Sequence, residues 1–236
     1  MLGLMRKFLV VLLLLLGVVA VVADVALRGV AEDMVSERMA ERLDMAEEPD
    51  VAIGGWAFLP QAVTGDYSQI TITADSAAMA GVTVEQIEAS ASDVRAPLSE
   101  LLDQPDVVAG TVDGSFVVPY SYFSAHLPEG MTVTTEGGEP RIIGELALPE
   151  LGLSTSVSAG GEFTVEGDTV RLTPVDVQLG DTPIDVGSMV EGMLSFSVQA
   201  PELPFGLTVT DMEATSNGLR ITGVGQDVPL MGSEAV

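Results

Sequence analysis

The pattern of apolar and polar positions separates a helical N-terminal part of the chain from a long β-rich part. The run from Phe8 to Ala23 contains no polar or charged residue, and Asp24 ends it. From Ala26 to about Leu43, apolar residues recur every three or four positions with charged residues between them. This spacing predicts a helix, and Pro49 closes the region.

Beyond Pro49 the pattern changes to alternation, which places apolar side chains on one face of a strand and polar ones on the other. Gly167-Asp168 and Asn217-Gly218 stand between such segments and are hairpin turn signals. We therefore expect antiparallel sheet with one face buried and one solvated. The alternating segments are 69–73, 131–134, 163–165, 169–172, 175–179, 207–210 and 219–222.

Three short helices are expected between the strands, at 98–102, 122–127 and 186–196. The third would carry Met189, Val190, Met193 and Leu194 on one side. No linker or low-complexity tract divides the chain, so residues 24–236 are expected to form a single domain after an N-terminal segment 1–23. The expected fold class is α+β with antiparallel sheet.

The N-terminal segment has the features of an export signal. Arg6 and Lys7 precede the apolar run, and Val21 and Ala23 are small residues suited to a cleavage point. The run has 16 residues, slightly fewer than the roughly 20 that span a bilayer. We expect an exported protein, and the segment is either a signal peptide that is removed or an N-terminal membrane anchor. No cysteine is present, so a lipoprotein anchor and disulfide bonds are excluded.

The charge of the chain narrows its partners. Thirty-five acidic residues against nine basic ones give a formal net charge of −26. A surface this acidic repels phosphate backbones, so nucleic acid is not expected as a partner. It also argues against adsorption to an anionic bilayer through a basic patch.

Residues suited to catalysis or metal binding are scarce. His126 is the single histidine, no Gly-x-Ser-x-Gly element accompanies it, and we interpret it as a helix-end or surface residue. One histidine and no cysteine remove the usual zinc, copper and haem ligands. We therefore expect no enzyme, no metal and no cofactor. The glycine pairs are interpreted as turns between strands, because they lack the helix entry of a nucleotide site: Gly54-Gly55, Gly137-Gly138 and Gly160-Gly161.

The segment from Pro49 to Ile72 is the most informative. Val51 and Ile53 are strand-like and lead into an expected turn with Trp56, the only tryptophan. Phe58, Leu59 and Pro60 follow in the same Gly/Pro-rich connection. Trp56 and its neighbours are interpreted either as an ordinary hydrophobic plug or as an apolar lip that contacts acyl chains.

These residues resemble a known family, the LmeA-like phospholipid-binding proteins of actinobacterial envelopes. The resemblance covers nearly the whole exported part, with its motifs in order. One departure is Ala57, where the family usually has proline. The matching motifs are Val51-x-Ile53-x-Gly55, Phe58-Leu59-x-Gln61, Gly65, Tyr67, Val117-Val118-Pro119-Tyr120, Leu127-Pro128-x-Gly130, Leu203-Pro204-Phe205-Gly206-Leu207 and Gly218-Leu219-Arg220-Ile221.

The resemblance implies an exported or membrane-anchored protein that binds phospholipid in the cell envelope, in a family linked to mannolipid maturation. It also implies a curved antiparallel sheet that wraps helix, as in tubular lipid-binding folds. Such a form leaves an apolar groove, in which each methylene of an acyl chain gains roughly 0.8 kcal/mol over water. Phospholipid and membrane are therefore the expected partners.

Alternation and the aromatic positions give the candidate residues of the groove. Arg141, Arg171 and Arg220 are the positive charges that either meet a phosphate headgroup or pair with the abundant acids. The expected lipid-binding residues are Trp56, Phe58, Leu59, Ile70, Ile72, Phe116, Tyr120, Phe123, Met193, Leu194, Phe196 and Phe205.

Three classes of function remain open at this level. Lipid binding, with transfer or support of glycolipid maturation, is favoured. A non-catalytic envelope scaffold that holds a protein partner is the alternative, and co-purified lipid would separate the two. A hydrolase or transferase is the third class, which an activity abolished by His126→Ala would indicate.

Overall fold

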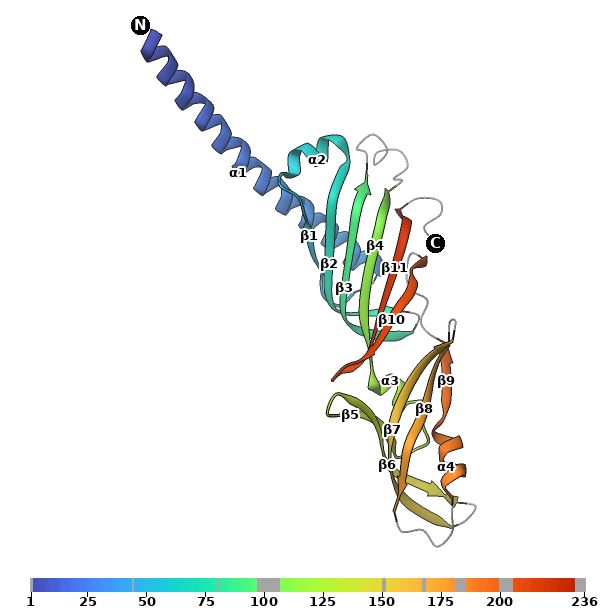
Figure 1. The fold of residues 1–236 in the computed structure, drawn as a ribbon. Helices are drawn as coiled ribbons and strands as arrows, with labels where there is room; N and C mark the ends of the chain where they lie inside the picture. Colours follow the sequence, from blue (N-terminus) through green and yellow to red (C-terminus); the bar gives the residue numbers. More distant parts are fainter. Residues whose placement is uncertain are drawn as a thin grey trace. The chain divides into compact units, whose positions relative to one another are not determined.

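The computed structural model describes residues 2–43, 45–79, 81–96, 107–149, 152–166, 169–180, 186–199 and 206–231. Four helices and eleven strands lie in these ranges (Figure 1). Their bounds are α1 Leu2–Leu43, β1 Asp50–Ile53, α2 Phe58–Thr64, β2 Asp66–Met79, β3 Val82–Arg95, β4 Val107–Pro119, α3 Tyr120–Ser124, β5 Met131–Glu136, β6 Glu139–Leu148, β7 Leu153–Glu166, β8 Thr169–Leu179, α4 Gly187–Leu194, β9 Phe196–Gln199, β10 Thr208–Ala214 and β11 Gly218–Met231.

The strands form two sheets. One has six strands in the order β1-β2-β3-β4-β11-β10, and the other has five in the order β5-β6-β7-β8-β9. The pairs β1–β2, β10–β11, β5–β6, β6–β7, β7–β8 and β8–β9 are antiparallel. The predicted fold class is confirmed: the chain is α+β, with mostly antiparallel sheet and an N-terminal apolar helix.

The contacts of the chain group into two compact units. Unit 1 comprises Met1–Ala74, Glu88–Asp113 and Gly225–Val236, and unit 2 comprises Asp75–Ile87 and Gly114–Val224. These ranges divide β2, β3, β4 and β11, so each of those strands contributes residues to both units. This explains why no linker is visible in the sequence: the boundaries between the two units fall inside strands and not in loops.

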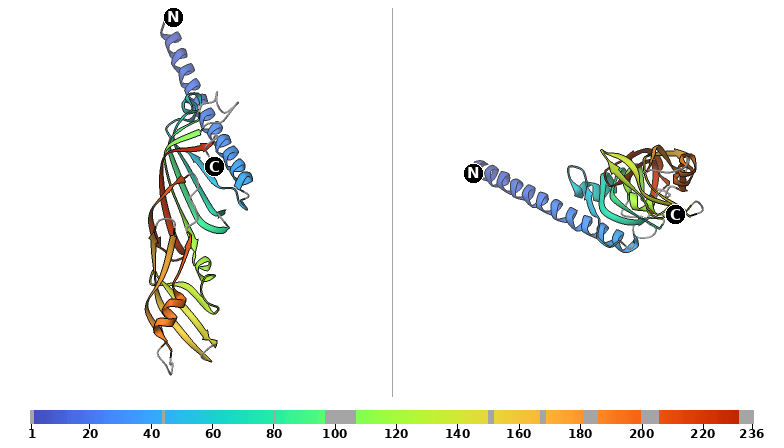
Figure 2. Two further views of the ribbon diagram at one scale, coloured as in Figure 1. Left: turned by 90° about the vertical axis from the view of Figure 1, so that its right-hand side faces the viewer. Right: turned by 90° about the horizontal axis from the view of Figure 1, so that it is seen from below.

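Unit 1 contains α1, α2, β1 and the adjoining parts of the six-stranded sheet. The C-terminal half of α1 lies beside β1 and α2, and its N-terminal half projects away from them (Figures 1 and 2). The predicted helix from Ala26 to Leu43 and the apolar run before it are therefore one continuous helix.

Unit 2 has a close-packed apolar core. Large side chains far apart in its sequence are fully buried there, among them Phe123, Ile142, Leu172, Leu194 and Ile221. Helix α4 packs on β8, and α3 packs on β5. Because side chains in a buried core are close-packed, adding or removing volume there is costly.

The predicted strands are all found, several within longer strands. Segments 169–172 and 175–179 are one strand, β8. The Asn217-Gly218 signal marks the turn between β10 and β11 correctly. The predicted Gly167-Asp168 turn and the predicted helix at 98–102 lie outside the described residues, although Glu166 pairs with Thr169 across the former.

Three local predictions are wrong. Helix α3 ends at Ser124 and not at Leu127. Phe196 begins β9, because α4 ends at Leu194. Gly160 and Gly161 lie inside β7, beside a shift of register after Ser158, and not in a turn. A glycine inside a strand often marks a bulge or a close approach of other atoms.

The apolar face expected on the third short helix is also wrong in part. Val190 and Leu194 are fully buried, whereas Met189 and Met193 are 49% and 40% exposed. Positions four residues apart share one face of a helix. The i, i+4 pair of shorter, branched side chains therefore packs on β8, and the methionine pair faces solvent.

Candidate functional site

The C-terminal half of α1, the docked half, is attached to the rest of unit 1 through polar side chains. Asp24, Arg28, Glu32 and Ser36 are spaced four residues apart, so they lie on one face of the helix. All four take part in hydrogen bonds to the backbone of residues 49–59. Of the apolar residues that indicated this helix, Leu27, Val30 and Met34 are exposed.

Asp24 supplies the N-terminal cap of α2. The carboxylate accepts hydrogen bonds from the amides of Phe58 at 2.9 Å and Leu59 at 2.7 Å. The residue before the helix, Ala57, offers no side-chain cap. Because the first amides of a helix have no partner within it and favour negative charge, a carboxylate from α1 stabilises α2 in place.

Arg28 extends this link one turn further along α1. Its guanidinium lies 3.7 Å from the Asp24 carboxylate and donates a hydrogen bond to the Gly55 carbonyl at 3.3 Å. The loop carrying Trp56 is thus connected to α1 on both sides of the tryptophan, through Gly55 and through Phe58.

Glu32 and Ser36 bind the exposed edge of strand β1. The Ile53 amide donates to Glu32 Oε1 at 2.7 Å, and Ser36 Oγ donates to the Pro49 carbonyl. Strand β1 is the last in the order of its sheet, so the Ile53 amide has no further strand to pair with, and Pro49 directly precedes the strand. Covering the edge with a helix prevents it from pairing with another chain.

Gln61 holds the Trp56 loop and α2 together from inside. Its amide group donates to the carbonyls of Gly54 at 3.0 Å and Ala57 at 2.8 Å, and its Oε1 accepts from the Ser68 amide at 2.8 Å. The side chain is buried. One glutamine therefore bonds backbone groups before and after the helix. The segment from Gly55 through Gln61 to Gly65 accordingly forms a single structural unit.

The two large aromatic residues of this segment differ sharply in burial. Phe58 is buried, with its ring centroid 6.3 Å from that of Tyr67, and Trp56 is 92% exposed. The interpretation of Trp56 as a hydrophobic plug is therefore wrong. The segment after it is helix α2 and not only a turn. Pro60 is compatible with this because the first turn of a helix has no amide bonds to lose.

Strands β1 and β2 present an apolar face within unit 1. Val51 pairs with Ile72 and Ile53 with Ile70, so the four side chains lie on the same side of the sheet. The β1 residues are buried, whereas Ile70, Ile72 and Leu59 are half-buried. Tyr67, also in β2, contacts Phe58, and burial raises the pKa of its phenol.

The remaining predicted lipid-binding residues belong to unit 2. Phe116, Tyr120, Phe123 and Leu194 are buried members of its core, and Phe196 packs against that core from a half-buried position. Met193 is exposed, and Phe205 lies outside the described residues. The predicted residues therefore form two sets in two units, Trp56 to Ile72 in unit 1 and Phe116 to Phe196 in unit 2.

Two aromatic side chains that pack against the unit 2 core, Tyr122 and Phe196, also contact His126. The His126 ring stacks on Phe196 at 5.6 Å between centroids and contacts Tyr122 edge-on, and its Nδ1 lies 2.9 Å from the Tyr122 carbonyl. These contacts place the histidine just after α3, in aromatic packing. Tyr120 donates a hydrogen bond to the Thr215 carbonyl at 2.9 Å. Burial, with a smaller effect of the Glu139 charge, raises its pKa.

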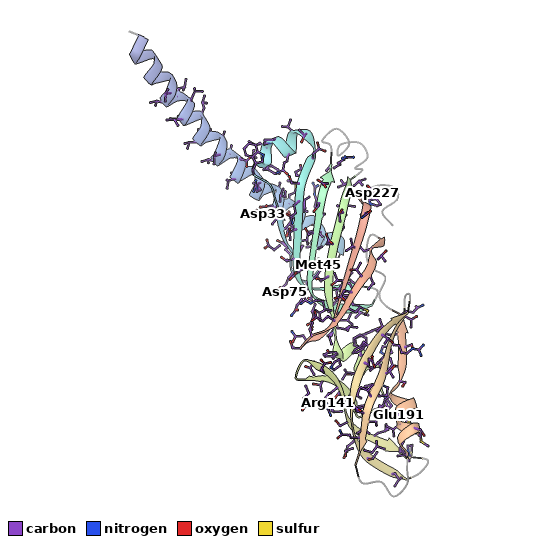
Figure 3. All side chains as sticks on the ribbon, viewed as in Figure 1. Asp33, Met45, Asp75, Arg141, Glu191 and Asp227 are labelled. Atoms are coloured by element: carbon purple, nitrogen blue, oxygen red, sulfur yellow. The ribbon has the colours of Figure 1, made fainter. Side chains whose placement is uncertain are left out.

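The candidate headgroup arginines all lie in unit 2 and have local partners. Arg141, labelled in Figure 3, contacts the Glu136 carboxylate at 3.1 Å and donates to Ser158 Oγ at 2.6 Å. Arg220 donates to Gln86 at 3.2 Å, and Arg171 also has an interaction partner. Within the described part of the chain, no cluster of three histidine or acidic side chains is arranged to hold a metal ion.

Comparison with known proteins identifies the family. The family model described as LmeA-like phospholipid-binding matches residues 22–224. The chain belongs to this family. No curated protein and no solved structure matches the chain. The resemblance predicted from the sequence is confirmed, and the LmeA-like region includes the docked half of α1, α2 and residues of both units.

Sequence reasoning missed the polar face of α1, although this LmeA-like chain carries a signal for it. Asp24, Arg28, Glu32 and Ser36 recur every four residues beside apolar positions that show the same helical period. Both patterns predict a helix equally well, and only the tertiary contacts show that the polar face is the one that docks.

Proposed function

We propose that this protein is a non-catalytic lipid carrier of the cell envelope, which holds phospholipid by its acyl chains and stays attached to the membrane through α1. The match of residues 22–224 to a phospholipid-binding family carries the proposal. The acyl chain provides the affinity, because roughly 0.8 kcal/mol per buried methylene accumulates without a charged anchor. Transfer of the bound lipid, in support of envelope glycolipid maturation, is the role that fits such a carrier.

The apolar face of β1 and β2 in unit 1 is the proposed place for the acyl chain. Ile70 and Ile72 are only half-buried there, and they adjoin the buried Val51 and Ile53. Unit 2 offers less room, because Phe116, Tyr120 and Phe123 already fill its core. An acyl chain on the unit 1 face would remove apolar surface from water without displacing packed side chains.

Helix α1 is the proposed anchor. It is long and apolar enough over Val10–Glu41 to cross a membrane, and its side chains from Val10 to Val22 are exposed (Figure 3). The helix continues without a break through Ala23 and Asp24, the candidate cleavage point. Arg6 and Lys7 precede the apolar run, and positive charge favours the cytoplasmic side, so the rest of the chain would lie outside.

Native mass spectrometry with lipid extraction on the purified full chain tests lipid binding. Ile72→Asn places an amide on the proposed acyl-chain face and is expected to lower the amount of bound phospholipid. Thr73→Asn is the matched control, because the next residue of the strand points to the opposite face and is exposed. Phe58 is unsuitable for a charge substitution since it is 7% exposed and such a change would disrupt the fold.

Equal lipid content in both variants would reject the unit 1 face as the site. A folded chain that carries no lipid and takes up no added phospholipid would reject the carrier function itself and favour an envelope scaffold. A lipid-modifying activity that His126→Ala abolishes would contradict the non-catalytic assignment.

A further inference from the structure

We infer that the segment from Trp56 to Val63 is a bilayer-docking surface, which rests in the headgroup layer of the same membrane that α1 crosses. The surface consists of Trp56, Pro60 and Val63, all exposed. The inference rests on the proposed anchoring of α1 and adds a second membrane contact, made by the folded body of unit 1.

The surface is rigid and strongly apolar. Trp56 is 92% exposed and Val63 is 80% exposed, the two most exposed large apolar side chains among those described. Both positions are held by hydrogen bonds: Gln61 donates to the carbonyls of Gly54 and Ala57 on either side of Trp56, and Asp24 caps α2, which carries Val63. A fixed, exposed apolar patch marks a place of contact with a partner or a membrane.

The link between Asp24 and α2 places this surface next to the end of the apolar run. Asp24 is the first polar residue after Phe8 to Ala23, and it bonds directly to the amides of Phe58 and Leu59. Helix α2 lies at the end of the unit 1 sheet from which the N-terminal half of α1 projects (Figures 1 and 2). A bilayer that holds the run to Ala23 therefore has its surface at the level of α2.

The chemistry of the segment fits a zwitterionic lipid surface. Residues 54–65 contain no charged residue, although the chain as a whole has a net charge of −26. Tryptophan is enriched at the membrane interface because its ring is apolar and its N–H remains hydrated. Val25 and Leu27 of α1, just after Asp24, are exposed as well.

The single tryptophan makes the inference directly testable. The full chain would be reconstituted in phosphatidylcholine vesicles, with lipids brominated at shallow or deep positions of the acyl chain as quenchers. We expect a blue-shifted Trp56 emission that shallow bromines quench more than deep ones. Val63→Asp, which places a carboxylate at an exposed position of the surface, should shift the emission back toward that of hydrated tryptophan.

A relocated tryptophan provides the matched control. In the variant Trp56→Phe with Glu41→Trp, the reporter lies 17 residues beyond Asp24 on the same helix, about 25 Å along its axis at 1.5 Å per residue. Its emission should remain that of hydrated tryptophan, with no bromine quenching.

Flotation of the vesicles distinguishes failure of the proposed α1 anchor from failure of the proposed docking surface. If the chain floats with the vesicles but Trp56 remains hydrated and unquenched, the docking surface is rejected while the anchor stands. If the chain does not float, the anchor fails and the docking surface fails with it. Trp56 that is shielded from acrylamide yet not quenched by bromine would indicate contact with a second copy of the chain and would also overturn the inference.

Discussion

At the scale of single residues, the conformation of the Trp56 loop depends on Gly55 and on the side chain of Gln61. Gly55 has φ +104°, and a Cβ there would lie 2.5 Å from Nε2 of Gln61. The glycine is required both by its backbone conformation and by the buried amide beside it. The glycine was visible in the sequence as a turn signal, but its contact with Gln61 was not.

Gly55→Ala is therefore expected to destabilise the protein by about 1–3 kcal/mol, the usual cost of a side chain forced into such a backbone region. Chemical or thermal unfolding measures the change. Gly192→Ala is the control, because Gly192 lies in α4 with no atom near its Cβ position, and alanine is favoured over glycine in a helix by up to about 1 kcal/mol. Equal effects of the two substitutions would show that the Gln61 contact is unimportant.

Tyr120 gives the protein a dependence on alkaline pH. Burial and the Glu139 charge raise its pKa above the ordinary value of 10.0, so the folded state favours the neutral phenol. The stabilisation is fully present below pH 10.0 and is lost as the pH rises from there through the higher folded value. The free energy of unfolding should fall over this range, and it should fall less steeply in Tyr120→Phe. If the free energy of unfolding, measured by urea titration, fell equally steeply with pH in both proteins, the assignment to Tyr120 would be contradicted.

At the scale of elements, α1 shows why periodicity identifies a helix without identifying its docking face. Apolar residues at Leu27, Val30 and Met34 have the correct spacing for a packed helix, yet they are exposed. The face that docks is polar because its partners are backbone groups: the free edge of β1 and the first amides of α2. Hydrogen bonds to such groups require acceptors and donors, which apolar side chains lack.

Glu32→Ala should loosen the edge of β1 without unfolding unit 2. The Ile53 amide, which donates to Glu32 at 2.7 Å, would lose its acceptor and exchange its hydrogen faster. Hydrogen–deuterium exchange of the β1 amides measures this. Glu37→Ala, at an exposed position on another face of α1, should leave the exchange unchanged. An unchanged Ile53 rate in Glu32→Ala would mean that the contact does not protect the edge.

At the scale of the whole molecule, the net charge follows directly from the sequence. A net charge of −26 on 236 residues makes like charges repel in the compact state. Among the described residues, Arg28 lies beside Asp24 and Arg141 beside Glu136, while the acidic residues outnumber the basic ones by 35 to nine. The folded state is therefore expected to be under electrostatic strain at low ionic strength.

Raising the salt concentration should stabilise the protein. At an ionic strength of about 0.15 M, charges further apart than roughly 8 Å are largely screened, so self-repulsion weakens. The melting temperature is expected to rise from low salt to this range, equally with sodium and potassium chloride. A fall in melting temperature would show that attractive pairs dominate over the net charge.

The sequence by itself determined the fold class, the N-terminal apolar helix, most strands and the family. These features are local or repeated: apolar periodicity follows from the geometry of a helix or strand, and turn residues follow from allowed backbone angles. Family membership is similar, since the ordered motifs from Val51 to Ile221 lie within the matched residues 22–224.

Only the tertiary structure decided which face of each element packs and what surrounds each candidate residue. Trp56 and Phe58 look alike in sequence, yet one is exposed and the other buried, because Gln61 and Asp24 fix the loop between them. Met193 and Leu194 likewise differ in burial through their positions on α4 over β8. Such outcomes depend on contacts between residues far apart in the chain, which no local pattern records.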